Sequence, residues 1–192
     1  LTKKDFDEQS RSPRIVLFSV AGEAAFEHFE DTILNDVATS KFPNSEMKKL
    51  PKVRMWGAMD RTTNLNRGKW SKLQKGDILL FWRGKKYVAK MIIDGTEDNY
   101  DIAKMIWGVK DDHETMNIES RPDETWQLIM YSSPENVTRT DIEAKSLNKL
   151  LGYAENFMPT RTLDFLPVRE SRLQELQTKY GSIQKALESI GL

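Results

Sequence analysis

The chain has 192 residues, which is enough for one domain with a substantial hydrophobic core. Its 29 basic and 29 acidic residues give zero formal net charge, which argues against an extended nonspecific nucleic-acid binder but allows a local basic patch. Cysteine is absent, which excludes disulfides, thiolate metal sites and thiol catalysis. No run approaches the roughly 18 apolar residues of a membrane span and no signal-peptide pattern is present, so we expect a cytoplasmic protein without membrane association.

The first third of the chain predicts one strand and one helix. Residues 1–12 are polar and charged, and Pro13 follows them, so a loose arm is expected there. Residues 14–20 are rich in β-branched and aromatic side chains, which is typical of a strand. Apolar residues then recur at helical spacing over residues 24–36, which predicts an amphipathic helix.

The central stretch predicts a strand, a polar connector and a β-hairpin. Residues 53–56 form a short apolar run that we expect Gly57 to end. Two further β-rich runs, residues 78–82 and 87–93, are separated by a short glycine-containing turn, which is the pattern of a hairpin. The continuous apolar character of the first run predicts burial on both faces of the sheet.

The next part of the chain alternates between polar and apolar stretches. Residues 94–99 have turn-forming composition, whereas residues 102–107 are a short apolar run that could be helix or strand. Residues 111–123 are highly charged and are interpreted as a solvated loop. Residues 126–131 predict a further strand.

The last part of the chain is expected to be helical. A helix could be capped by Thr138 or Thr140 and ended by Gly152. The longest helical pattern covers residues 170–190, with an apolar stripe and an expected break at Gly181.

Several of these motifs, in this order, resemble those of PUA-like domains, specifically the EVE and YTH branch. The matching features are a tryptophan at a strand end, a polar loop, a Gly-Asp turn into a hairpin, and later aromatic strands. They are Trp56, Leu73 to Asp77, Leu80-Phe81, Tyr87 to Ala89, Trp107-Gly108 and Trp126 to Tyr131. Residues 147–153 are similar to the segment that follows the barrel in the amino-terminal specificity domains of McrB-type restriction proteins.

The resemblance covers roughly residues 13–168 and implies an α+β fold, a PUA-like small β-barrel with peripheral α-helices. It implies three parts: a loose arm at residues 1–12, a nucleic-acid-binding domain at residues 13–168, and a helical extension at residues 169–192. In McrB-type proteins a nucleotide-binding motor follows the specificity domain, and the extension is expected to lead toward it.

No catalytic constellation is recognisable in the sequence. Neither phosphate-cradling glycine pattern is present. Ser19, His28 and Asp31 could be drawn as a triad, but their spacing has no nucleophile elbow and such triples are expected by chance. With only His28 and His113 as imidazoles, a zinc centre is not expected. We therefore predict no catalytic residues, no metal site and no cofactor.

Two of the five tryptophans are candidate binding residues because the resemblance points to them. In YTH domains two tryptophans sandwich a methylated adenine, and Trp56 and Trp126 match those positions. Stacking of a base on an aromatic ring contributes about 1–3 kcal/mol. The expected pocket also includes Ser19, Ala21 and Gly57, although the loop after the first strand lacks the asparagine of YTH domains. The remaining tryptophans, interpreted as core, are Trp70, Trp82 and Trp107.

Basic residues concentrate beside this candidate pocket. Nine of them lie between Lys48 and Lys75. A run of charges is usually a solvated face, but its position here favours contacts to phosphates, which position a protein on nucleic acid without reading its sequence. The expected backbone contacts are Lys49, Arg54, Arg61, Arg67 and Lys69.

The favoured hypothesis is a modified-base reader that binds methylated double-stranded DNA, with 6-methyladenine as the expected base. The base would be flipped into the aromatic pocket, at an unstacking cost of a few kcal/mol. Cleavage would belong to a nuclease subunit and a nucleotide-driven motor as partners. The alternatives are a YTH-type reader of methylated adenine in RNA and a barrel that binds protein or a small molecule.

Overall fold

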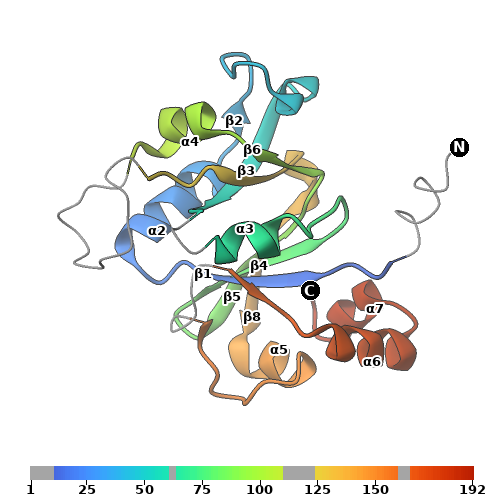
Figure 1. The fold of residues 1–192 in the computed structure, drawn as a ribbon. Helices are drawn as coiled ribbons and strands as arrows, with labels where there is room; N and C mark the ends of the chain where they lie inside the picture. Colours follow the sequence, from blue (N-terminus) through green and yellow to red (C-terminus); the bar gives the residue numbers. More distant parts are fainter. Residues whose placement is uncertain (1–10, 61–63, 110–123, 160–164) are drawn as a thin grey trace, which may run out of the picture.

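The computed structural model describes residues 11–60, 64–109, 124–159 and 165–192. The fold is α+β, with strands in two sheets and helices around them (Figure 1). The larger sheet has the strand order β8-β5-β4-β1-β9, and the smaller one has the order β2-β3-β7-β6. We call them the five-stranded and the four-stranded sheet. The arm predicted at residues 1–12 lies outside the described residues except for Arg11 and Ser12, and the charged stretch at residues 111–123 lies entirely outside them.

The five-stranded sheet contains the predicted hairpin. Its strands are β1 (Ile15–Ser19), β4 (Ile78–Arg83), β5 (Lys86–Ile92), β8 (Val137–Glu143) and β9 (Leu166–Pro167). The turn of the hairpin has Gly84 and Lys85 at φ values of 56° and 71°, as a two-residue turn between twisted strands requires. Strand β4 lies between β5 and a parallel β1 and is buried on both faces up to Trp82, which confirms that prediction.

The four-stranded sheet differs from the sequence-based expectation at two places. Its strands are β2 (Val37–Ala38), β3 (Lys52–Ala58), β6 (Gly95–Asp98) and β7 (Leu128–Ser132). Gly57 does not end β3 but lies inside it, paired with Ile129. The turn predicted at residues 94–99 is wrong, because β6 pairs with β7 along four residues there. Cross-strand hydrogen bonding outweighs the turn-forming composition.

The helices cover the outer faces and one edge of the sheets. They are α2 (Glu23–Phe29), continued by a π-helical turn at Glu30–Leu34, α3 (Leu65–Trp70), α4 (Tyr100–Trp107), α5 (Ala144–Leu150), α6 (Glu170–Tyr180) and α7 (Ile183–Glu188), with 3-10 turns η2 (Glu46–Lys49) and η3 (Pro134–Asn136).

Three expectations about the helices can be compared with the structure. Residues 102–107, for which the sequence allowed helix or strand, lie in helix α4. The Asn99 side chain caps this helix by accepting a hydrogen bond from the amide of Ile102 at 3.1 Å. The predicted cap at Thr138 or Thr140 is wrong, because both residues lie on β8 and the helix begins at Ala144. The break at Gly181 is confirmed by its φ of 83° between α6 and α7.

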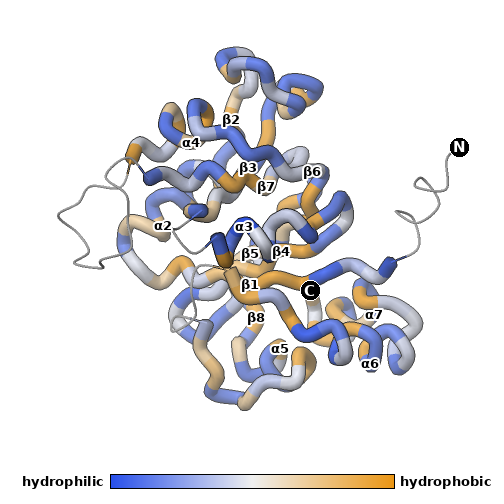
Figure 2. Tube along the Cα trace, viewed as in Figure 1, coloured by the Kyte–Doolittle hydropathy of each residue, from blue (hydrophilic) through white to orange (hydrophobic). Residues whose placement is uncertain are grey.

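Three hydrophobic cores separate these layers. Helices α5, α6 and α7 pack on one face of the five-stranded sheet, with Leu173 and Leu187 against Ile15 and Leu17. The second core fills the space between the two sheets. The third lies on the outer face of the four-stranded sheet beneath α4 and η2. The strand β1 passes through the middle of the molecule as an apolar segment (Figure 2).

Candidate nucleic-acid interface

Trp56 lies in the core between the two sheets. It is 7% exposed, and its ring packs edge-on against Phe18 at 6.0 Å and Phe81 at 5.3 Å between ring centroids. Side chains alternate along β3, so Trp56 and Ala58 point inward while Met55 and Gly57 point to the opposite face. Trp56 is therefore a packing residue and does not form the wall of an open pocket.

Trp126 lies on the other side of the same strand, where Gly57 allows it to come close. A Cβ at position 57 would be 2.3 Å from the Trp126 carbonyl oxygen and 2.7 Å from the Trp107 ring. The Trp126 ring stands edge-on to His28 at 4.5 Å, and His28 lies 6.2 Å from Trp107. His28, Trp107 and Trp126 are partly exposed, and we call them the outer aromatic cluster.

The outer aromatic cluster has two electrostatic features. Burial lowers the pKa of His28, while the nearby Asp31 carboxylate opposes that shift. The indole nitrogen of Trp107 is buried and has no hydrogen-bond partner among the described residues. Trp107 packs against the third core, as predicted from the sequence, and its exposed part belongs to the same cluster as Trp126.

The structure therefore brings Gly57 and Trp126 together but not Trp56 and Trp126. Ser19 is in register with Trp82 at the end of β1 and faces the helical side of the five-stranded sheet, away from both. Ala21 is exposed just beyond it. The structure thus does not bring all of the expected pocket residues to one place, and a role of Trp126 in base binding remains a prediction.

Most of the predicted phosphate-contacting residues already have carboxylate partners. Arg54 donates to Asp36 at 2.9 Å and to the carbonyl of Ile33 at 2.7 Å. Arg67 bridges Asp60 at 2.7 Å and Asp98 at 2.6 Å, and these hydrogen bonds raise its pKa.

Of two further predicted contacts, one also has a carboxylate partner. Lys49 pairs with Glu46 on η2, and Arg61 lies outside the described residues. Local pairing neutralises much of the charge that made this stretch appear basic in the sequence.

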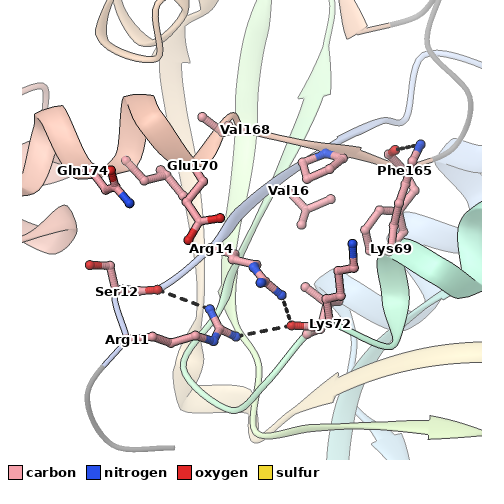
Figure 3. A pocket seen from close by; sticks show the side chains of 13 residues that line it. Arg11, Ser12, Arg14, Val16, Lys69, Lys72, Phe165, Val168, Glu170 and Gln174 are labelled. Carbon is pink, nitrogen blue, oxygen red and sulfur yellow. Dashed lines mark hydrogen bonds between the residues drawn. The ribbon is translucent and has the colours of Figure 1, made fainter. Parts of the chain in front are cut away.

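Lys69 has a different environment. Its ammonium donates to the carbonyl of Phe165 at 2.9 Å, beside a cavity of about 470 Å³ (Figure 3). Arg14, which donates to the carbonyl of Lys72, and Lys72 itself line the same space. We call it the cationic cavity. The sequence analysis missed Arg14, because three segments far apart in the chain meet here and no local motif marks them.

The described residues lack two other features. They contain no cluster of three or more His, Asp or Glu side chains that could hold a metal ion. None of the helices described is long and apolar enough to cross a membrane.

The architecture is α+β, with two sheets and surrounding helices, as the sequence motifs predicted. No protein-family model matches the chain, and no curated protein sequence is significantly similar to it. Among solved structures, it is similar to the N-terminal domain of Thermococcus gammatolerans McrB bound to m5C DNA. The TM-score is 0.57 at 16% identity, over 93% of this chain and 99% of that one. The chain thus has the fold of that McrB domain.

Proposed function

We propose that this chain is a reader of methylated DNA and has no catalytic activity of its own. The observation that carries the proposal is the structural match along 93% of the chain to a McrB domain that was solved with methylated DNA. The partly exposed aromatic cluster, and the cavity cations that form no ion pair among the described residues, supply what such a reader needs. Rings can stack on a base, and cations can hold phosphates.

In this proposal the methylated base is flipped out of the duplex and stacks on Trp126. Gly57 supports that role, because it lets Trp126 lie directly on β3. Because Ser19 faces away from Trp126, only the exposed Ala21 of the two predicted residues at the end of β1 is proposed to approach the DNA strand near the flipped nucleotide. Lys69 is the strongest candidate for a phosphate contact, because it has no carboxylate partner among the described residues. The YTH resemblance favours 6-methyladenine, whereas the solved McrB domain holds 5-methylcytosine.

The proposal places the chain in a McrB-type restriction system in the cytoplasm. Residues 13–168 would bind DNA, and residues 169–192 would connect this domain to a nucleotide-driven motor. DNA cleavage would then belong to a separate nuclease subunit. A reader needs only affinity and discrimination from this chain, which agrees with the aromatic and cationic groups described above.

Direct binding tests the proposal. Three duplexes of one sequence, carrying one 6-methyladenine, one 5-methylcytosine or neither, are titrated with the chain at several salt concentrations. We expect tighter binding of one methylated duplex and a common salt dependence, because phosphate contacts do not register the methyl group. Equal affinity for all three duplexes would contradict the proposal, and preference for a methylated single-stranded RNA would redirect it to RNA.

A further inference from the structure

The cationic cavity forms where three segments distant in sequence meet. Residues 11–14 lie on one side, the end of α3 and the turn after it on a second, and β9 with the first turns of α6 on a third (Figure 3). Its volume of about 470 Å³ lies within the roughly 300–1,000 Å³ that is usual for small-molecule sites. The cavity therefore has room for one nucleotide unit.

The cations of the cavity differ from the arginines that were predicted to contact phosphates. Elsewhere Arg54 and Arg67 are ion-paired, and in the cavity Arg11 is paired with the buried Asp77 at 2.7 Å. Arg14 and Lys69 instead donate to backbone carbonyl groups, which fix their positions, and neither forms an ion pair with a carboxylate among the described residues.

The third free cation lies beside them. The ammonium of Lys72 forms no ion pair with any described residue, although its own carbonyl holds Arg14. In a chain of zero net charge, three cations without an ion pair among the described residues gather around a cavity with one described carboxylate, Glu170, which makes it a candidate anion site.

The remainder of the lining is suited to the uncharged part of a nucleotide. Apolar side chains form much of the wall, and Ser12 and Gln174 supply polar groups at the rim. The apolar residues are Val16, Leu73, Phe165, Pro167, Val168 and Leu173. Glu170 is the one carboxylate among the described lining residues and extends toward Arg14 (Figure 3).

We propose that the cationic cavity binds one nucleotide unit, with its phosphate held by Arg14, Lys69 and Lys72 and its sugar and base against the apolar wall. This inference rests on the proposed function, because the nucleotide is taken to belong to the bound DNA. It lies outside the methylated position. A free nucleotide has the same chemistry and is distinguished below. Because the phosphate is common to all sequences, the site adds affinity and no preference for methylation.

The first test removes charge. The double variant Arg14→Gln/Lys72→Gln should weaken binding of methylated and unmodified duplexes by the same factor. With a salt slope of about 0.9 per phosphate contact, each lost contact corresponds to roughly fivefold at 0.15 M salt. Lys145→Gln is the control, because that lysine is paired with Glu155 at 3.0 Å outside the cavity. Duplex affinity and salt slope equal to those of the Lys145 control would overturn the proposal.

The second test includes a variant that should increase affinity, and a gain of affinity cannot be explained by misfolding. Glu170→Gln removes the carboxylate that competes for the cations, and duplex binding should tighten several-fold. Gln174→Trp should fill the cavity mouth and weaken binding without changing charge, whereas Gln184→Trp on α7, outside the cavity, should not. Unchanged affinity in both Glu170→Gln and Gln174→Trp would contradict the site.

A third experiment distinguishes a nucleotide of the bound DNA from a free nucleotide. It also distinguishes failure of this inference from failure of the proposed function. Deoxyadenosine monophosphate added as competitor should displace duplex only at high concentration, because it offers one of several contacts. Displacement of all duplex at micromolar nucleotide would overturn the assignment to DNA and make the cavity a free-nucleotide site. If the cavity variants bind like the parent while methylation preference persists, this inference fails and the proposed function stands. If the parent chain shows no preference for methylated DNA, the proposed function is contradicted instead.

Discussion

The two sides of strand β3 carry tryptophans in opposite situations. On the inner side Trp56 is enclosed between the two sheets by Phe18 and Phe81. On the outer side Trp126 rests on Gly57 and shares a partly exposed cluster with His28. The same residue type thus supports the fold on one side and is free to contact a ligand on the other. Position relative to the strand, and not residue type, separates the two roles.

Replacing the inner tryptophan should have the largest effect. Trp56→Ala leaves a large cavity between the sheets, and a buried tryptophan cut to alanine typically costs about 3–5 kcal/mol of unfolding free energy. Urea unfolding followed by circular dichroism measures this loss. Trp126→Ala is the matched comparison and should lose clearly less stability because its ring is partly exposed. Equal losses in the two variants would erase the distinction between the two sides.

The sequence predicted the hairpin, β1 and the paired C-terminal helices because their signals are local. A continuous apolar run in β4 and a glycine at position 181 between two helical patterns need no information from elsewhere in the chain. The resemblance to PUA-like domains then supplied the arrangement of these parts, and the solved McrB domain has the same fold.

The site was less predictable because it depends on register and on distant partners. The pairing of Gly57 with Ile129 decides which way Trp56 points, and nothing near Trp56 in the sequence states that pairing. Likewise, Arg54 is neutralised by Asp36, 18 positions away, and Lys69 contacts Phe165 across 96 positions. A count of basic residues along the chain cannot separate paired cations from free ones.

A substitution at Gly57 tests whether the close approach of Trp126 to strand β3 depends on the absence of a side chain there. Gly57→Ala places a methyl group 2.3 Å from a backbone oxygen, so the segment around Trp126 must move. Overpacking of this kind costs about 1–3 kcal/mol, and the outer aromatic cluster should be displaced with it. Gly68→Ala in α3 is the control, because nothing lies within 4 Å of its added Cβ and alanine favours a helix. A Gly57 variant as stable as the Gly68 variant would refute the close contact.

Removing the outer ring should act on binding more than on stability. Trp126→Ala should cost about 1–3 kcal/mol in binding of the preferred methylated duplex, the value of one stacking partner. Binding of unmodified duplex should change little, because the phosphate contacts remain. Fluorescence anisotropy with both duplexes measures the two affinities. A parallel loss for both duplexes would assign Trp126 to structure and leave the methyl group to be recognised elsewhere.

The ion-paired Arg67 should contribute less to DNA binding than the cations of the cavity. Arg67→Gln breaks two partly exposed ion pairs, and such pairs contribute about 0–1 kcal/mol each. Because its charge is already balanced by Asp60 and Asp98, the slope of log affinity against log salt should stay close to that of the parent. A drop of about one unit would instead make Arg67 a phosphate contact.

The smallest expected effect is the pH dependence contributed by His28. Burial lowers its pKa from the ordinary value of 6.5, so the folded state holds this imidazole neutral at a pH where the unfolded chain has begun to bind a proton. The unfolded state therefore binds more protons as the pH falls below the ordinary value, and stability decreases with falling pH until the folded-state pKa is passed. His28→Gln removes this contribution, so its unfolding free energy should decline less than that of the parent between pH 7.5 and pH 5.5. Asp31 partly opposes the lowering of the His28 pKa and so provides the control. The unfolding free energy of Asp31→Asn should decline more steeply with falling pH than that of the parent. Identical pH profiles for the parent and His28→Gln would show that the environment of His28 in the outer aromatic cluster does not favour the neutral imidazole.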